Sequence, residues 1–195
     1  MFSKAPEREE ARRDEKGYNY TDMYYVPYSS GEFGKERVFS SALKFPFSAG
    51  ATSFSADEQH MYFTKVTKGK GGKSITKIMR ADYGKDDWHE DVKSLKFNSK
   101  TYSCAMPALS VDGSYMVFVS DMPGGEGGKD LYITFREGSV WGKPRNLGPV
   151  INTAGDEVFP YVNTDGELYF ASDGHPGFGG LDIFKAQKSA NSWES

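Results

Sequence analysis

Residues 107–113, PALSVDG, recur 53 residues later as PYVNTDG at 160–166. One residue is then lost, and the match continues at a constant offset of 52. The positions that agree at this offset are Phe118 with Phe170, Ser120 with Ser172, Asp121 with Asp173, Gly128 with Gly180, Asp130 with Asp182, Tyr132 with Phe184 and Trp141 with Trp193. A repeat of this length indicates that one supersecondary unit is used several times.

The same unit is found upstream. Ser55 and Asp57 match Ser110 and Asp112 at an offset of 55, and Trp88 matches Trp141 at 53. A shorter copy near the start lies 108 residues before its counterpart, which is two repeat lengths, and its matching residues are Asp22, Met23, Tyr24, Phe33, Gly34, Lys35, Arg37 and Phe39. The chain therefore contains three copies of the unit and one half-copy.

Each copy has the pattern of four β-strands. In the best copy a buried run (PALS) leads through an Asp-Gly turn to a second apolar run (YMVFV), and a glycine-rich loop leads to a third (DLYITF). The tryptophan introduces a fourth strand around RNLG. Repeats of about 50 residues with four strands each are typical of β-propeller blades. We predict an all-β fold, a β-propeller of four-stranded antiparallel blades.

The interspersed basic and acidic residues of 1–17 predict a charged leader or possible helix, and the repeats predict propeller blades over 18–195. They divide the propeller into a partial blade at 18–47, a blade at 51–100, a blade at 104–153 and an incomplete blade at 157–195. The first partial blade supplies strands three and four, whereas the last unit has strands one to three, so the two overlap at strand three. We therefore expect an incomplete portion of a larger propeller, with six to eight blades.

Composition narrows the possible functions. The chain has 195 residues, a formal charge of −3 and lysines scattered among carboxylates, so no basic surface for nucleic acid or an anionic membrane is predicted. Cys104 is the only cysteine, which excludes an intrachain disulfide. No run approaches the roughly 20 apolar residues needed to cross a bilayer, so no transmembrane segment is expected.

The repeat resembles a known family. The runs VSDMPGGEGGKDLY, NLGPVINTAGDEVFPYV and LYFASDGHPGFGGLDIF, between 119 and 184, resemble the WD40-like (PD40, TolB-type) propeller repeats of OmpA-family envelope lipoproteins of the Bacteroidota. They are most similar to the PorE-type lipoproteins associated with type IX secretion. The match covers 18–195 more loosely, and the 51–100 blade fits least well.

This resemblance implies a location and a class of partner. The protein would be periplasmic and associated with the outer membrane, and its partners would be envelope or secretion-system proteins. In the family the propeller lies between a helical repeat region and an OmpA-like domain that binds peptidoglycan. Neither that domain nor a lipidated cysteine is visible in the sequence, so peptidoglycan binding is expected only through a C-terminal domain that this chain lacks.

The sequence contains no complete nucleotide- or dinucleotide-binding motif. A phosphate-binding loop needs the motif G-x-x-x-x-G-K-[ST]. Around Gly72-Lys73-Ser74 the position of its first glycine is occupied by Thr67. In the loop at 120–132 that position is occupied by Pro123. The glycines of that loop recur at 172–184 without the lysine. A backbone that must turn between two strands therefore explains them better than phosphate binding does. We expect no cofactor.

Catalytic and metal motifs are also missing. His60, His89 and His175 occupy different blade positions without a second ligand at metal spacing, and no motif pairs Cys104 with a base. Asp130 and Asp182 recur before the third strand, as does Asp22, where a carboxylate accepts backbone N–H bonds and holds the loop. We therefore do not expect this chain to be an enzyme. We expect its three tryptophans to pack between blades.

Binding is the function that remains. The longest loops join the second and third strands, and the residues that do not repeat there are the candidate protein contacts: Met122, Glu126, Lys129, His175 and Phe178. The first hypothesis is a non-enzymatic periplasmic scaffold of an outer-membrane-associated lipoprotein, linked to the type IX secretion machinery and to cell-envelope anchoring. The alternative is a ligand- or glycan-binding accessory propeller of an envelope hydrolase.

Overall fold

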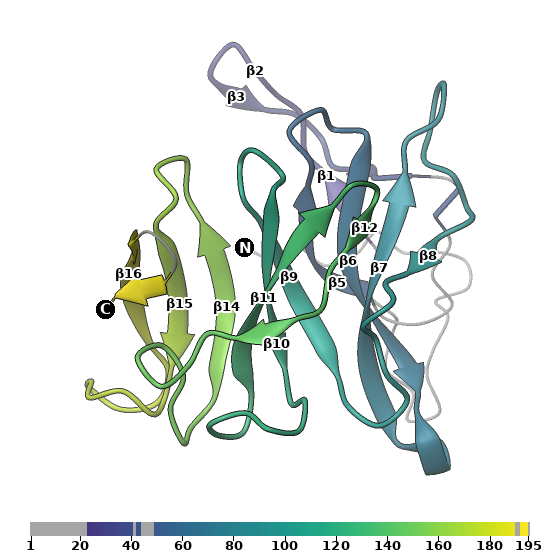
Figure 1. Cartoon of the computed structure of the whole chain (residues 1–195). Helices are drawn as coiled ribbons and strands as arrows, with labels where there is room; N and C mark the ends of the chain where they lie inside the picture. The colour runs from purple at the N-terminus through teal and green to yellow at the C-terminus, as the bar shows by residue number, and fades with distance from the viewer. Residues whose placement is uncertain (1–22, 41, 44–48, 190–191, 195) are drawn as a thin grey trace.

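The computed structural model describes residues 23–40, 42–43, 49–189 and 192–194. Figure 1 shows three twisted antiparallel sheets standing side by side in an arc, with a smaller unit of short strands beside them. Apart from one short 3-10 turn, η1 (Lys70–Gly72), the regular structure of these residues is β. The prediction of an all-β propeller is confirmed. The leader helix predicted at 1–17 and the predicted role of Asp22 lie outside the described residues.

Each sheet corresponds to one copy of the sequence repeat, and we call the units the partial unit and blades 2, 3 and 4. The partial unit contains β1 (Tyr24–Tyr25), β2 (Tyr28–Ser29), β3 (Glu32–Phe33) and β4 (Arg37–Val38). Blade 2 contains β5 (Ala49–Phe54), β6 (His60–Lys68), β7 (Ser74–Asp82) and β8 (Lys93–Ser94). Blade 3 contains β9 (Cys104–Leu109), β10 (Tyr115–Ser120), β11 (Asp130–Glu137), β12 (Val140–Trp141) and β13 (Arg145–Asn146). Blade 4 contains β14 (Glu157–Val162), β15 (Leu168–Ser172), β16 (Asp182–Ser189) and β17 (Ser192–Glu194).

The turn between the first two strands has the chemistry that its sequence predicts. In blade 3 the Asp112 carboxylate accepts hydrogen bonds from the Ser110 hydroxyl at 2.6 Å and from the Ser114 N–H at 3.0 Å. Gly113 adopts a left-handed φ of 67°, which a residue without Cβ adopts at no steric cost. In blade 4 the Asn163 side chain takes over the acceptor role toward the Asp165 N–H. The turn therefore depends on side-chain acceptors and a left-handed residue.

The first strand of each blade contains a bulge that the repeat did not predict. Pairing with β10 shifts between Ala108 and Ala105, and Met106 in that gap has a φ of 52°. Phe159 has a φ of 54° at the matching place in β14. Both residues precede a proline, which has no N–H to donate and is therefore accommodated at a bulge. The Phe159 N–H donates to Met106 Sδ at 3.4 Å, so the two bulges contact each other across the blade boundary.

The cores lie between successive sheets. One cluster joins the partial unit to blade 2, a second joins blades 2 and 3, and the largest joins blades 3 and 4. The tryptophans lie at these boundaries, as predicted: Trp141 contacts Tyr62 of blade 2 with ring centroids 5.7 Å apart, and Trp193 contacts Tyr115 of blade 3 at 6.2 Å. A large ring at each boundary removes on the order of 200 Å² from water, which holds neighbouring blades together.

Candidate protein-interaction loops

The loops that join the second and third strands lie together at one end of the propeller, along the lower edge of Figure 1. In blade 3 the loop runs over 121–129, and in blade 4 over 173–181. The linker between β13 and β14 reaches the same end, because Glu157 at the start of β14 pairs with Ser172 at the end of β15. Three segments therefore meet here, and we call them the loop platform (121–129, 147–156 and 173–181).

One aspartate holds each loop, as the repeat predicted. Asp130 is buried, and its carboxylate accepts the Glu126 N–H at 2.7 Å and the Gly127 N–H at 3.2 Å. Asp182 accepts the N–H groups of Phe178 and Gly179 in the same manner, at 2.7 and 3.3 Å. These carboxylates are occupied by backbone donors, so they act as loop supports.

The linker adds a second set of supports. Asn152 is 1% exposed, and its side chain accepts the Leu131 N–H at 2.8 Å and donates to the Leu131 carbonyl at 3.0 Å. The Glu157 carboxylate is fully buried, and it accepts the Thr153 N–H, the Thr153 hydroxyl and the Ser172 hydroxyl. Because burying a polar group is costly unless it is hydrogen-bonded, this arrangement fixes the linker against both blades.

Sequence reasoning missed these two linker residues as supports of the site. Asn152 has a counterpart in blade 2, where Asn98 makes the same two hydrogen bonds to Ile78, but the run INTAGDE at 151–157 that contains both linker residues occurs once in the chain. Its chemistry depends on contacts with residues that are distant in sequence, such as Leu131 and Ser172. Only the folded arrangement brings these groups together.

Three of the five candidate contact residues are engaged within the protein. The Lys129 ammonium pairs with Asp156 of the linker, and the Lys129 N–H donates to the same carboxylate at 2.9 Å. Met122 is half-buried against the core between blades 2 and 3. The His175 ring contacts Phe184 at 5.0 Å, and its Nε2 lies 2.9 Å from the Ile151 carbonyl oxygen. These side chains stabilise the platform.

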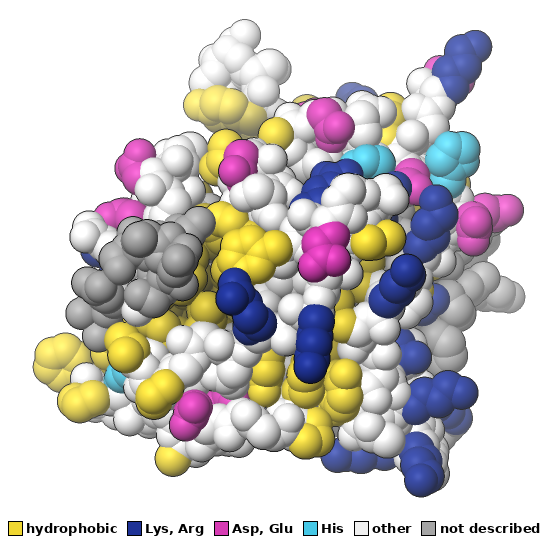
Figure 2. Space-filling model, in the orientation of Figure 1, with side chains coloured by type: hydrophobic (Ala, Val, Ile, Leu, Met, Phe, Trp, Pro, Cys, Tyr) yellow, Lys and Arg dark blue, Asp and Glu magenta, His cyan; other side chains and the backbone are white. Residues whose placement is uncertain are grey.

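The other two candidates face solvent. Glu126 is exposed, and Phe178 is fully exposed at 104%. Two further apolar side chains lie just beyond Phe178: Leu181 is 49% exposed and Ile183 is 80% exposed. Figure 2 shows hydrophobic side chains gathered at this lower left edge of the molecule, over the loop that joins β15 and β16. We call Phe178, Leu181 and Ile183 the apolar edge. In the sequence the last two belong to the apolar run LDIF, which predicts a strand and does not reveal that these side chains are exposed.

Groups that could carry chemistry lie apart in the structure. Within the described ranges, no three His, Cys, Asp or Glu side chains are grouped to hold a metal ion. Burial raises the pKa of the Cys104 thiol to about 12, so it stays protonated at neutral pH and is not a nucleophile. His60 is on blade 2, where its Nδ1 lies 2.9 Å from Asp82 Oδ1, whereas His175 is on blade 4.

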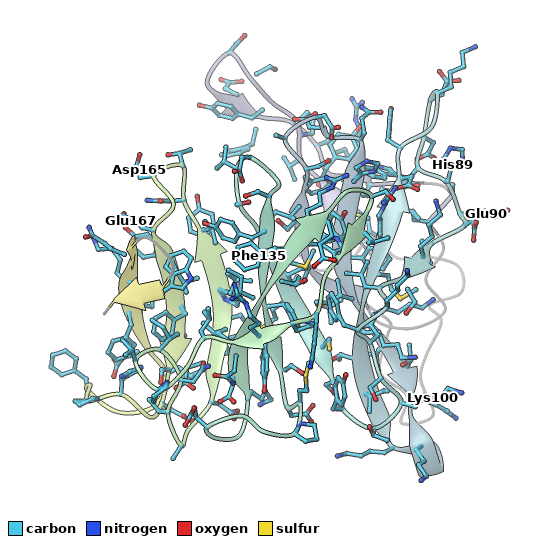
Figure 3. The ribbon with its side chains drawn as sticks, in the orientation of Figure 1. His89, Glu90, Lys100, Phe135, Asp165 and Glu167 are labelled. Atoms are coloured by element: carbon cyan, nitrogen blue, oxygen red, sulfur yellow. The ribbon has the colours of Figure 1, made fainter. Side chains whose placement is uncertain are left out.

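Two other carboxylates in ion pairs, Asp82 and Glu167, lie outside the loop platform. Partial burial opposes the charge of Asp82, but hydrogen bonds from Arg80 and Lys93 outweigh it and hold its pKa well below the usual range. On blade 4, a hydrogen bond from Lys185 and others from Gln187 and Tyr169 lower the pKa of Glu167 to about 2. Figure 3 shows Glu167 near Asp165, at the end opposite the loop platform. Neither carboxylate is placed to act on something bound there.

Comparison with known proteins supports the fold. No protein-family model matches the sequence, and no curated protein matches it closely enough to count as a relative. Among solved structures, TolB from Acinetobacter baumannii aligns with a TM-score of 0.53 and 14% identity, over 82% of this chain and 34% of that chain. A thermostable family-43 glycoside hydrolase aligns with a TM-score of 0.59 and 13% identity, over 93% of this chain and 68% of that chain.

These neighbours are β-propellers, and at such low identity they show a shared fold alone. The chain spans about a third of the length of the TolB chain it matches. Across the described residues no helix is long and apolar enough to cross a membrane.

Proposed function

We propose that this chain is a non-enzymatic protein-interaction propeller. The observation that carries the proposal is the apolar edge, where Phe178 and Leu181 are exposed on a loop that Asp182 holds in place and Ile183 is exposed at the start of β16. Exposed apolar groups in one place are typical of protein contact sites. A loop that is already ordered by internal hydrogen bonds loses less conformational entropy on binding than a flexible loop does. This lower cost favours binding of a partner.

The proposed setting is the bacterial cell envelope. The resemblance of 119–184 to PorE-type lipoproteins supports a periplasmic scaffold associated with the outer membrane and linked to type IX secretion. The partners would be envelope or secretion-system proteins that present an apolar surface to Phe178. Peptidoglycan would be reached only through an OmpA-like domain outside this chain.

Site-specific photo-crosslinking in cells tests this function. A photo-reactive amino acid is placed at Phe178 or, as a control, at Val111, which is 52% exposed on the turn that joins β9 and β10. We expect crosslinks from position 178 to one or a few defined envelope proteins, identified by mass spectrometry, and none of the same proteins from position 111. Equal crosslinking from both positions, or none from 178, would contradict the proposal.

A second candidate rests on aromatic rings of β14. Phe159 is 59% exposed and Tyr161 is 61% exposed on this first strand, and Tyr161 contacts Tyr169 with ring centroids 6.3 Å apart. Aromatic faces stack on sugar rings, so these residues support an accessory propeller that binds a glycan for an envelope hydrolase. Binding of peptidoglycan-derived oligosaccharides that is lost in Tyr161→Ala, but kept in Phe178→Ser, would favour this alternative over the protein scaffold.

A further inference from the structure

A pocket lined mainly by aromatic rings lies between the partial unit and blade 2. Its volume is about 530 Å³, which is within the range of roughly 300–1,000 Å³ typical of small-ligand sites. The six lining residues are Phe39, Phe54, Glu58, Gln59, Tyr83 and Trp88. They come from the segment after β4, the end of β5, the turn between β5 and β6 and the connection between β7 and β8. These turns lie at the end of the blade opposite the β6–β7 loop, so this pocket is separate from the loop platform.

The four rings form one contact group around Trp88. The Trp88 ring lies 5.7 Å from Phe39, 5.9 Å from Phe54 and 5.3 Å from Tyr83, measured between centroids. Trp88 is only 7% exposed, whereas Phe54 is 41% and Tyr83 is 39% exposed. A ligand would therefore meet the rings of Phe54 and Tyr83 with Trp88 behind them. Figure 3 marks the region by His89 and Glu90, which follow Trp88 directly.

The other blades do not repeat this arrangement. Tyr83 is paired with Trp88, but Arg136 pairs with Trp141 and Lys188 pairs with Trp193 at the same register position. The residues that correspond to Phe54 at the end of the first strand are Leu109 and Val162. Blade 2 therefore has aromatic rings at two positions where blades 3 and 4 pack with other residues, and one of them, Phe54, also contacts Phe39 of the partial unit at 5.9 Å.

Glu58 provides a second difference at the rim of the same pocket. It has a left-handed φ of 56°, at the turn position where blades 3 and 4 have Gly113 with 67° and Gly166 with 78°. A glutamate is strained in this conformation and a glycine is not, so the turn alone would favour glycine. The glutamate places a carboxylate beside the rings at a conformational cost.

The charge around the pocket favours a cation. Among the described lining residues the only charged side chain is Glu58. The segment 85–91, KDDWHED, surrounds Trp88 with four acidic residues and a single lysine. Aromatic faces carry a negative electrostatic potential, which attracts organic cations, and a nearby carboxylate adds to that attraction.

We propose that this pocket binds an organic cation of the alkylated ammonium type. The cationic group would lie against the rings of Phe54 and Tyr83, with Trp88 behind them and Glu58 supplying the counter-charge. Such a group is found in free quaternary ammonium compounds and at the end of a basic side chain of a protein. The inference does not depend on the loop platform, since the two sites share no residue.

Calorimetry and NMR titration with two molecules of the same shape test the proposal. Choline carries a trimethylammonium group, and 3,3-dimethylbutan-1-ol replaces its nitrogen by carbon and has no charge. We expect choline to bind roughly 3- to 30-fold more tightly than the neutral alcohol, which is the range of a cation–π contribution. Equal affinity of the two molecules, or no binding of either, would overturn the proposal.

Two variants locate the binding site. Glu58→Gly removes the carboxylate and installs the residue that blades 3 and 4 use, so folding is retained while choline binding weakens. Tyr83→Leu removes a ring and should also weaken binding. Glu126→Gln, which changes an exposed acid of the loop platform, and Tyr161→Leu are the matched controls and should bind choline as the parent protein does. If the controls lose binding as much as the pocket variants, the assignment to this pocket is wrong.

A further comparison distinguishes the source of the cation. The probe is lysine capped as its N-acetyl methylamide, which presents the ammonium group as a protein would. Tighter binding of choline than of capped lysine supports a free quaternary ammonium ligand. Tighter binding of capped lysine supports a basic side chain of a partner protein. Either result requires that Glu58→Gly reduces the binding, and an unaffected Glu58→Gly variant contradicts both.

Discussion

The loops of blades 3 and 4 share a support and differ in what they present. In both loops an aspartate before the third strand accepts two backbone N–H groups. The blade 3 loop is further tied down, because Lys129 pairs with Asp156 and Met122 is half-buried. The blade 4 loop instead projects Phe178 into solvent. Repeated residues therefore build the loop, and residues that do not repeat decide whether it can contact a partner.

The faces of the two blades differ in a similar way. Five side chains of β10 and β11 in blade 3 are buried against blade 4: Tyr115, Val117, Val119, Leu131 and Ile133. At an offset of 52 the matching positions of blade 4 are Glu167, Tyr169, Ala171, Ile183 and Lys185. The apolar face of one blade is replaced by a face with an ion pair and an exposed isoleucine. Blade 4 covers this face of blade 3, whereas within the described residues no further sheet covers the matching face of blade 4.

The largest effect on stability is expected from removing Asp130, and it should exceed the effect of removing Asp182. Asp130→Ala would leave two backbone N–H groups and the Asn146 amide, which donates at 3.0 Å, without their acceptor in a buried place. We expect a loss of about 2–4 kcal/mol in the free energy of unfolding, measured by urea denaturation. Asp182→Ala acts on an exposed loop where water replaces the carboxylate, so about 1 kcal/mol is expected. Equal losses of unfolding free energy in the two variants would contradict the expectation that the buried aspartate contributes more than the exposed one.

A smaller effect is expected from the ion pair that ties down the blade 3 loop. Lys129→Met removes the pair with Asp156, but both side chains are partly exposed and water screens them. The expected loss is about 0.5 kcal/mol, and it should decrease in high salt. A loss above roughly 2 kcal/mol, unchanged by salt, would mean that the pair is more deeply buried than its exposure indicates.

The ion pair between Glu167 and Lys185 of blade 4 predicts that stability depends on pH. Because the pKa of Glu167 is lowered from 4.5 to about 2, its stabilising contribution is present above pH 4.5 and is lost as the pH falls toward 2. NMR titration of the Glu167 carboxyl carbon measures this value directly. In Lys185→Met the main hydrogen-bond donor is lost, and the pKa should return toward 4.5. An unchanged titration in that variant would show that Lys185 does not hold the carboxylate.

Repetition determined what the sequence could predict. The turns at Asp112 and Asp165, the supports at Asp130 and Asp182 and the tryptophans between blades all occur in more than one copy, so one copy explained another. The bulges at Met106 and Phe159 were missed because left-handed φ angles in non-glycine residues depend on the neighbouring blade. The pairing of Lys129 with Asp156 was missed because its two partners occur once each and belong to different segments.

The candidate contact residues were only partly informative for the same reason. The sequence placed Met122, Glu126, Lys129, His175 and Phe178 on loops, but it did not reveal which of them turn back onto the protein. The burial of Met122 and the contact of His175 with Phe184 arise from packing between segments distant in sequence. Their role as protein contacts stays a prediction, and Phe178 is the one that the structure leaves best placed for it.

The central claim is that the apolar edge binds a protein, and paired variants test it most directly. Phe178→Ser and Val111→Ser each remove one exposed apolar side chain, at opposite ends of the propeller, and both should leave the urea unfolding midpoint unchanged. We expect Phe178→Ser to abolish recovery of the envelope proteins that crosslink to position 178 in the parent chain, and Val111→Ser to retain it. Full recovery with Phe178→Ser would contradict the account.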